Sequence, residues 1–178
     1  MRLFLSHLEK KAASSSLVFP VLFLGLFLIL NAGYRLLLTT NAKIFLIDYA
    51  VVKPAVLAIN WLQSAEEVTA LRDVLLSSHA RITISRGCDG YDVMLLLFAG
   101  ILAAPRKHMA SKLMAMLLGS ALIYSINQVR IVILYFALHI PYWFDLLHSV
   151  LLPLFIIAIA ILYYCTWLNQ DRDGNEEL

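Results

Sequence analysis

The chain is poor in charge. Only 15% of its 178 residues are Asp, Glu, Lys or Arg, whereas 61% are hydrophobic and the mean hydropathy is +0.80. A soluble domain averages about 25% charged residues, so this composition predicts an integral membrane protein. The net charge is only +2 and the basic residues are dispersed, which excludes a nucleic-acid-binding surface. Glycine and proline are also scarce, and the chain has no internal repeat or low-complexity tract.

Long apolar runs predict an all-α integral membrane protein that forms one domain over residues 1–178. A helix needs about 20 apolar residues to cross the hydrocarbon core of a bilayer. We expect four transmembrane helices, preceded by a basic leader over residues 1–16 and followed by an acidic tail over residues 169–178. The predicted spans are residues 17–38, 91–104, 113–138 and 146–168, the second of which is short and closed by Pro105.

The first span also resembles a signal peptide, because basic residues precede its apolar run. The run is long for a signal peptide, and Asn31-Ala32-Gly33 is a weak cleavage site. We therefore expect an uncleaved anchor.

Residues 44–62 form a second, ambiguous apolar segment. Asp48, Lys53 and Pro54 lie in its middle, where a lipid-exposed span would not tolerate them cheaply. We expect a helix lying in the membrane interface, anchored by Trp61. A five-span alternative, in which residues 44–62 cross the membrane and the N-terminus lies outside, stays open.

Residues 63–87 are polar and are expected to form a small extracytoplasmic segment. Arg81–Arg86 alternates between polar and apolar residues like a half-exposed strand, and Ser77-Ser78-His79 predicts the turn of a hairpin. The short loop between the two middle spans holds Arg106, Lys107 and Lys112, which assigns that loop and both termini to the cytoplasm. The basic residues that would then lie on the outer side are spread over a long segment and mixed with acidic ones. They therefore count less in the rule that assigns basic loops to the cytoplasm.

Arg130 is the most informative polar residue, because it lies inside the span over residues 113–138. A guanidinium at that depth costs from about 2.5 kcal/mol upward, so it is expected to face protein and to mark a functional site. At 1.5 Å per residue, Arg130 lies ~27 Å above Lys112, near the outer leaflet. Cys88 and His148 begin the neighbouring spans on that same side. The three residues are therefore expected at one depth.

These side chains suit nucleophilic attack on an acyl carbon. A thiolate is a strong nucleophile, and nearby cations favour it over the thiol. His148 is expected to hold the thiol proton and to return it to a leaving amine. Arg130 is expected to stabilise the thiolate or the oxyanion of a tetrahedral intermediate.

Four supporting residues surround this trio in the sequence. Asn127 lies one helical turn before Arg130 and is expected to hold the guanidinium or the substrate carbonyl. Asp145 is expected to orient the imidazole. Gly87 and Gly90 bracket the thiol and are expected to permit a tight turn and close approach of a substrate backbone.

Two further residues bear on the neighbourhood of the trio. Pro153 is expected to leave the Ser149 carbonyl without its helical partner and to bend the helix below His148. The role of Asp92, four residues past the thiol, stays open between capping and steering the entry of the span.

The second cysteine, Cys165, is expected at the opposite, cytoplasmic end of the last span, which excludes a disulfide with Cys88. We interpret Cys165 as a packing residue. The other histidines lack ligand-like spacing, so neither a metal site nor a cofactor is expected.

Three sequence blocks together resemble the signature blocks of the exosortase/archaeosortase family, in the same order and on membrane segments. They are Gly87-Cys88-Asp89-Gly90, Asn127-Gln128-Val129-Arg130-Ile131 and Phe144-Asp145-Leu146-Leu147-His148. The resemblance covers roughly residues 48–162 and is nearest to the compact exosortase subgroup. Asp89 departs from the Glu, Asn or Ser that many members have after the cysteine, and its role stays open.

The resemblance implies a membrane-embedded cysteine transpeptidase or peptidase, a thiol hydrolase with the catalytic residues Cys88, Arg130 and His148. It implies a multi-pass protein of the bacterial cytoplasmic (inner) membrane, with its site on the extracytoplasmic side. The implied partners are membrane lipid and exported proteins that carry a C-terminal sorting tail of motif, transmembrane helix and basic cluster. The sorting motif, the choice between hydrolysis and transfer, and the oligomeric state stay open.

Two other classes of function compete with this interpretation. A non-catalytic scaffold or assembly subunit of an export system would use Arg130 as a structural pair and would tolerate Arg130→Lys. A small transporter with Arg130 on an anion path is disfavoured, because the sequence has neither a repeat nor paired broken helices.

Overall fold

The computed structural model describes residues 2–63, 67–78, 81–84, 87–105 and 108–173. Within these ranges the elements follow in the order α1 (Arg2–Leu38), η1 (Ile44–Val52), α2 (Lys53–Leu62), β1 (Thr69–Leu71), β2 (Val74–Leu76), β3 (Arg81–Thr83), α3 (Tyr91–Ala103), α4 (Met109–Ala137), α5 (Pro141–Leu146), η2 (Leu147–Leu151) and α6 (Leu152–Asp173). Four helical stretches are long and apolar enough to cross a membrane: Leu17–Leu38, Ile44–Leu62, Met109–Ala137 and Pro141–Gln170. The chain is therefore a mainly helical, multi-pass membrane protein.

Three of these four stretches correspond to predicted transmembrane helices, and one does not. Residues 91–104 correspond to α3, whose 13 residues extend only about 20 Å, less than a ~30 Å bilayer core. The fourth long helix is instead Ile44–Leu62, where η1 continues into α2. The charges that argued against this segment are paired with each other. Lys53 lies 3.7 Å from Asp48, and its ammonium stands 3.4 Å above the Tyr49 ring.

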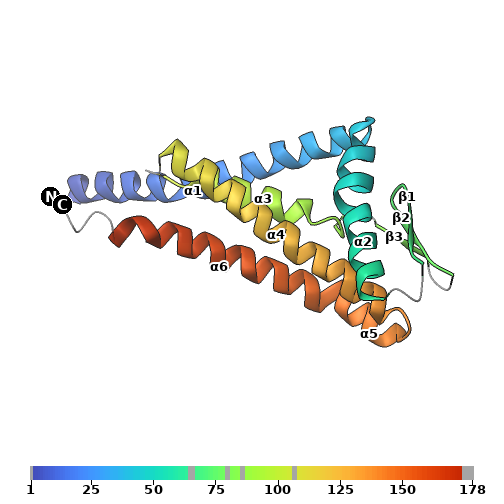
Figure 1. The fold of residues 1–178 in the computed structure, drawn as a ribbon. Coiled ribbons are helices and arrows are strands. Elements are labelled where there is room, and N and C mark those ends of the chain that lie inside the picture. The colour runs from blue at the N-terminus through green and yellow to red at the C-terminus, as the bar shows by residue number, and fades with distance from the viewer. Residues whose placement is uncertain (1, 64–66, 79–80, 85–86, 106–107, 174–178) are drawn as a thin grey trace.

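The helices α1, α3, α4 and α6 run along roughly one direction, and η1 and α2 run crosswise at one end of them (Figure 1). α1 begins and α6 ends at the opposite end of the molecule (Figure 1). The chain thus passes up through α1, down through α3, up through α4 and down through α6. This order brings the start of α3, the last part of α4 and the start of α6 to the end that carries α2 and the sheet.

Two clusters of buried apolar residues hold these elements together. One lies among α3, α4 and α6 and is centred on Leu97, Ile101, Ile123 and Ile156. The other joins η1, α2, the sheet and α4, and it includes Cys88. The thiol therefore lies at the border of a packed core.

The sheet is antiparallel, with the strand order β1-β2-β3. β2 lies between its neighbours, with Thr69 opposite Leu76 and Leu75 opposite Ile82. The sequence predicted a strand over Arg81–Arg86. The structure has β3 over Arg81–Thr83, while Arg86 and the predicted turn residue His79 lie outside the described residues.

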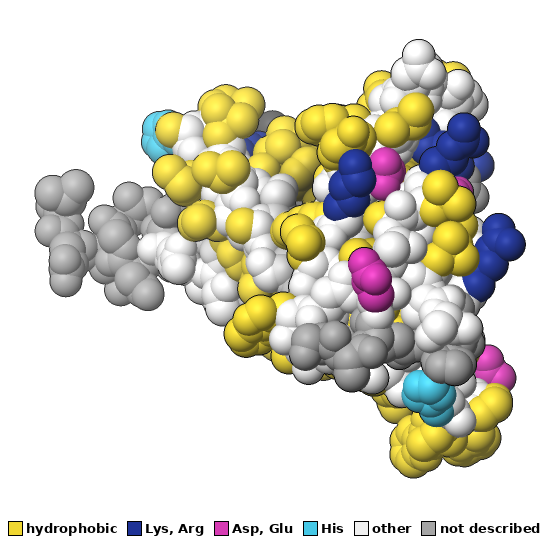
Figure 2. All heavy atoms as spheres, turned by 45° about the vertical axis from the view of Figure 1, so that its right-hand side comes forward, with side chains coloured by type: hydrophobic (Ala, Val, Ile, Leu, Met, Phe, Trp, Pro, Cys, Tyr) yellow, Lys and Arg dark blue, Asp and Glu magenta, His cyan; other side chains and the backbone are white. Residues whose placement is uncertain are grey.

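Basic side chains gather on the end of the molecule that carries α2 and the sheet, as Figure 2 shows with that end turned forward. Acidic partners accompany them. Lys43 is hydrogen-bonded to Asp73 at 3.1 Å, and this bond holds the pKa of the Asp73 carboxyl below its ordinary value. Lys53 is paired with Asp48 in the same way, so each of these two pairs has no net charge.

Both π-helical segments end two residues before a proline, Pro54 for η1 and Pro153 for η2. In the last hydrogen bond of each segment, the donor lies five residues after the acceptor. The Lys53 N–H donates to the Asp48 carbonyl, and the Leu152 N–H donates to the Leu147 carbonyl. Continued by one residue, the second pattern would require an N–H from Pro153, which proline lacks. The carbonyl left without a helical partner is therefore that of His148. The sequence had predicted that the Ser149 carbonyl lacks a helical partner, from the α-helical pattern, and that stays a prediction.

Candidate active site

The Cys88 turn joins the sheet to α3. Gly87 and Gly90 on either side of it adopt left-handed backbone conformations, with φ of 87° and 81°. Such conformations are open to glycine at little cost. The Cys88 side chain is buried, and its carbonyl accepts a hydrogen bond from Asn127 Nδ2 at 3.2 Å. The turn therefore fixes the thiol against the wall of α4.

His148 lies beside the thiol although 60 residues separate the two in sequence. Cys88 Sγ is 3.8 Å from Nδ1 and 3.7 Å from Nε2 of the imidazole. Phe144, one helical turn earlier, stacks on the imidazole with the ring centroids 5.5 Å apart and the planes 6° apart. Stacking restricts rotation of the ring and so keeps both nitrogens at a similar distance from the sulfur.

Asp145 does not orient the imidazole as expected. Its side chain is exposed, and the described residues contain no hydrogen bond between it and His148. Its negative charge lies within electrostatic range of the imidazole. Phe144, which was part of a quoted sequence block but carried no assigned role, has the orienting position instead.

Arg130 bridges the two segments that carry the thiol and the imidazole. Its Nη1 donates to the Gly87 carbonyl at 3.2 Å, and its Nη2 donates to the His148 carbonyl at 3.4 Å. The second acceptor is the carbonyl that Pro153 deprives of its helical donor. The residue is 5% exposed, and its guanidinium lies within electrostatic range of Cys88 and Asp89. Arg130 therefore joins the segments that carry both reactive residues and supplies positive charge within electrostatic range of the sulfur.

Asn127 does not hold the guanidinium, and its expected contact with a substrate carbonyl stays a prediction. Asn127 instead holds the main chain of Cys88, and its Oδ1 is buried without a hydrogen-bond partner among the described residues. Gly90 makes this contact possible, because a Cβ on Gly90 would lie 2.8 Å from Asn127 Cγ. The close approach that this glycine permits is therefore that of α4.

Replacing Gly90 by Ala is expected to lower the free energy of unfolding by about 2–4 kcal/mol, from a left-handed backbone and a clash with Asn127. Gly87→Ala is the matched control: φ is also positive there, but a Cβ would meet no atom within 4 Å. It should cost only about 1 kcal/mol. Thermal unfolding of the two purified variants in detergent checks the difference. Equal losses would show that Asn127 does not restrict Gly90.

Asp89, next to the thiol, is a buried carboxyl whose role the sequence analysis had left open. Asp89 is 3% exposed and accepts hydrogen bonds from the Tyr34 hydroxyl at 2.5 Å and the Tyr91 N–H at 3.2 Å. Nearby, Asn31 Nδ2 donates to Asp92 at 3.3 Å. Asn31 and Tyr34 lie three residues apart in an apolar run, so they share one face of α1. That spacing was a usable signal that α1 contacts the Cys88 turn.

Burial raises the pKa of the Asp89 carboxyl, while its hydrogen bonds from Tyr34 and Tyr91 oppose the rise. A carboxyl whose pKa rises on folding binds its proton more tightly in the folded state. Its contribution to stability is therefore present at low pH and is lost as pH rises through the raised pKa.

Tyr34→Phe removes a donor to the Asp89 carboxylate, so its cost is expected to be about 1.5–3 kcal/mol at pH 8 and clearly smaller at pH 4. Thermal unfolding at the two pH values measures it. Tyr91→Phe is the control, because that hydroxyl donates to the Leu46 carbonyl and its loss should not depend on pH. A pH-independent cost of Tyr34→Phe would contradict ionisation of Asp89 in this range.

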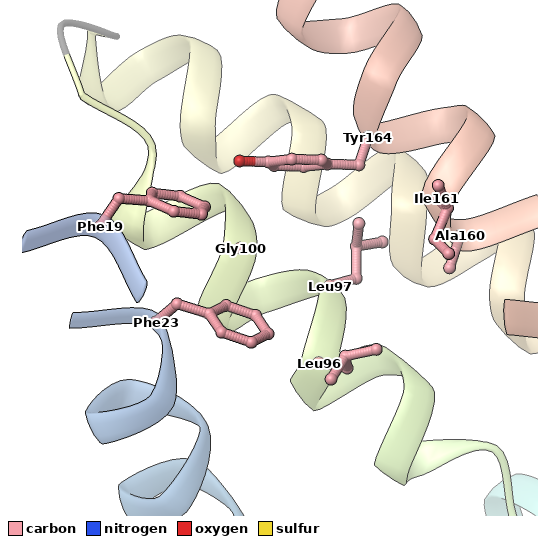
Figure 3. A pocket seen from close by; sticks show the side chains of 8 residues that line it. All are labelled: Phe19, Phe23, Leu96, Leu97, Gly100, Ala160, Ile161 and Tyr164. Atoms are coloured by element: carbon pink, nitrogen blue, oxygen red, sulfur yellow. The ribbon is translucent and has the colours of Figure 1, made fainter. Parts of the chain in front are cut away.

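A cavity of about 300 Å³ opens beside the thiol and the imidazole. β3 forms one wall, and apolar side chains of α4 and α5 form the other: Ile131, Leu134, Leu138 and Phe144. A second hollow lies between α1, α3 and α6 (Figure 3). Its described lining residues are apolar apart from the Tyr164 hydroxyl and include no thiol, imidazole or charged group. The cavity beside Cys88 is therefore the candidate active site.

Cys165 is exposed on α6, so its interpretation as a packing residue within this chain was wrong. Both cysteines are free. Among the residues that the structure describes, no group of three or more His, Cys, Asp or Glu side chains is arranged to hold a metal ion.

Lys112 is buried, although the sequence predicted a loop position for it. Its ammonium donates to the Leu102 carbonyl at the end of α3 at 2.8 Å. It therefore caps α3 as well as contributing positive charge at that end of the bundle.

Comparison with known proteins gives no relative from which a function could be inferred. No protein-family model, no curated protein and no solved structure matches the chain.

Proposed function

We propose that the chain is an exosortase-like cysteine transpeptidase or peptidase that removes C-terminal sorting tails from exported proteins. The observation that carries the proposal is the position of the Cys88 sulfur, 3.7–3.8 Å from both ring nitrogens of His148. Such a pair, in a cavity at one end of a membrane bundle, places a nucleophile within sulfur hydrogen-bond distance of a base, which supports the proposal. The three blocks that resemble the exosortase/archaeosortase family supply its residues.

The reaction begins with transfer of the thiol proton from Cys88 to His148. The thiolate attacks the carbonyl carbon of the scissile peptide, and an S–C bond forms as the carbonyl oxygen takes negative charge. Positive charge on Arg130 favours both the thiolate and this oxyanion. The C–N bond then breaks, His148 gives its proton to the leaving amine, and the tail departs with its helix. An amine, a hydroxyl or water resolves the thioester and frees Cys88.

The site lies on the extracytoplasmic side of a bacterial cytoplasmic membrane in this proposal. The η1–α2 helix then lies in the membrane interface, which its crosswise direction at the end of the bundle supports (Figure 1). Trp61 is 84% exposed, as an interfacial anchor would be. Exposed Tyr142 and Trp143 at the start of α5 fit the same interface. The sheet of β1, β2 and β3 is the extracytoplasmic hairpin region.

A non-catalytic membrane scaffold is the second candidate, and one observation favours it. The hydrogen bonds that Arg130 makes within the described residues go to main-chain carbonyls, as a purely structural arginine would make them. This candidate requires no thiol at position 88.

The proposal is tested in the cells that encode the chain, by mass spectrometry of the C-termini of their exported and membrane proteins. Deleting the gene is expected to leave a set of proteins with intact C-terminal tails of helix plus basic cluster, and reintroducing the wild-type chain should restore their cleavage. Reintroducing the Cys88→Ala variant at the same membrane level should not. Restored cleavage with Cys88→Ala would favour the scaffold, and unchanged C-termini after deletion would refute both roles in tail processing.

A further inference from the structure

The cavity beside Cys88 has an unusual wall: it touches four consecutive residues of one strand segment, Arg81, Ile82, Thr83 and Ile84. Successive side chains of a strand point to opposite faces of a sheet. A cavity that touches all four must therefore run along the edge of the strand rather than over one face. β3 is an edge strand in the order β1-β2-β3.

The register of the sheet shows which main-chain groups lie on that edge. The Ile84 N–H donates to the Asp73 carbonyl at 2.7 Å, in register with the pairs of Leu75 with Ile82 and of Val74 with Thr83. In an antiparallel ladder, hydrogen-bonded and non-hydrogen-bonded pairs alternate. Ile82 and Ile84 thus bond to β2, and the N–H and C=O groups of Arg81 and Thr83 point to the open edge. Both of these residues are exposed.

We propose that the cleavage motif of the substrate binds as an extended strand on this edge of β3, with main-chain hydrogen bonds to Arg81 and Thr83. An added strand of this kind is a common mode of peptide recognition. It would lie between β3 and the apolar wall of α4 and α5, with Cys88 and His148 along its path. This inference rests on the proposed function and adds how the substrate is held.

The surroundings of the edge favour this occupant over others. The cavity volume of about 300 Å³ is at the lower end of the range for ligand sites, which suits a short peptide rather than a folded domain. Main-chain donors and acceptors that have no partner among the described residues are satisfied by another main chain, whereas a lipid acyl chain would leave them unpaired. The edge is also continuous with the thiol, so a peptide bound there is already positioned for attack.

Thr83→Pro tests the inference, because it removes the N–H that faces the open edge and spares those that face β2. Proline is tolerated at such edge positions. With a purified tail peptide from a protein whose processing requires this chain, Thr83→Pro is expected to raise KM about tenfold, the effect of one main-chain hydrogen bond. The kcat should change by less than about threefold, and alkylation of Cys88 by iodoacetamide should keep its wild-type rate.

Ala70→Pro is the matched control. By the same alternation the Ala70 N–H faces the far edge of the sheet, on β1, so this variant should keep the wild-type KM. An unchanged KM in Thr83→Pro overturns the inference, as does an equal rise in both variants. If the wild-type chain forms no Cys88 adduct with the tail peptide, the proposed function fails rather than the docking mode.

A second measurement does not depend on the proline variant folding. Thr83→Cys is combined with Cys88→Ala and Cys165→Ala, and tail peptides with one cysteine at successive positions are added under oxidising conditions. Disulfide yield is expected to alternate with a period of two residues across the cleavage motif. A flat profile, no cross-link to the peptide, or cross-linking only between two copies of the chain would overturn the inference.

Discussion

Cys88→Ala is expected to abolish formation of a covalent adduct with a substrate tail and to lower kcat for tail cleavage by roughly 10⁴-fold or more. The reason is that the described cavity holds a single thiol, which lies within 4 Å of the imidazole nitrogens. Intact-mass analysis of the purified protein, incubated with a tail peptide, measures the adduct directly and identifies the cut site.

Cys165→Ala is the matched control for this variant. It removes the other thiol, which is exposed on α6 outside the cavity, and should leave the adduct and the rate of cleavage unchanged. Cys165→Ala should also show wild-type thermal unfolding, because that thiol is exposed. Cys88→Ala removes a buried thiol at the border of the core, so it should lower the free energy of unfolding by about 1 kcal/mol. Tail cleavage by Cys88→Ala at the wild-type rate would remove the case for a thiol enzyme.

Arg130→Lys is expected to lower kcat by about 10²-fold or more, although the positive charge is kept. A guanidinium donates in two directions at once and joins the Gly87 carbonyl to the His148 carbonyl. A single ammonium on a flexible stem does not reproduce this geometry, and displacement of reacting groups by about 1 Å can cost 10²-fold in rate. A buried carbonyl left unpaired would also cost about 1–3 kcal/mol of stability.

The measurement is single-turnover cleavage of the tail peptide, with thermal unfolding run in parallel. Arg35→Lys is the control: Arg35 is an exposed arginine on α1 that bonds to Asn31, away from the cavity, and its replacement should leave the rate unchanged. The scaffold candidate predicts that Arg130→Lys retains full function in cells. A wild-type rate for Arg130→Lys would show that bridging by the guanidinium is not needed for catalysis.

The assignment of a common site to Cys88, Arg130 and His148 was possible from sequence because depth in a membrane is nearly one-dimensional. Each residue lies at a countable distance from the end of an apolar run, and a helix converts that count into height. Height does not give the direction in which a side chain points. For that reason the sequence did not assign the acceptors of Arg130, the partner of Asn127 or the missing contact of Asp145.

The contact of α1 with the Cys88 turn shows the same limit. Asn31 and Tyr34 were visible as polar residues in an apolar helix, but their partners Asp92 and Asp89 lie more than 50 residues away. Such pairs depend on which helices become neighbours, and short connections between apolar runs do not specify that neighbourhood. The role of the edge of β3 likewise depends on the packing of α4 and α5 opposite the sheet.

The sequence by itself determined that the chain is a helical membrane protein, which helical stretches are apolar, and that a thiol, a guanidinium and an imidazole approach one end of the bundle. These features follow from composition and periodicity, which act locally along the chain. The tertiary structure decided what each polar group contacts. It selected the His148 carbonyl as the second acceptor of Arg130, because the Leu152 N–H bonds to the Leu147 carbonyl and Pro153 has no N–H to offer. Which carbonyl the guanidinium reaches depends on how α4 packs against the start of α6, which local sequence patterns do not determine.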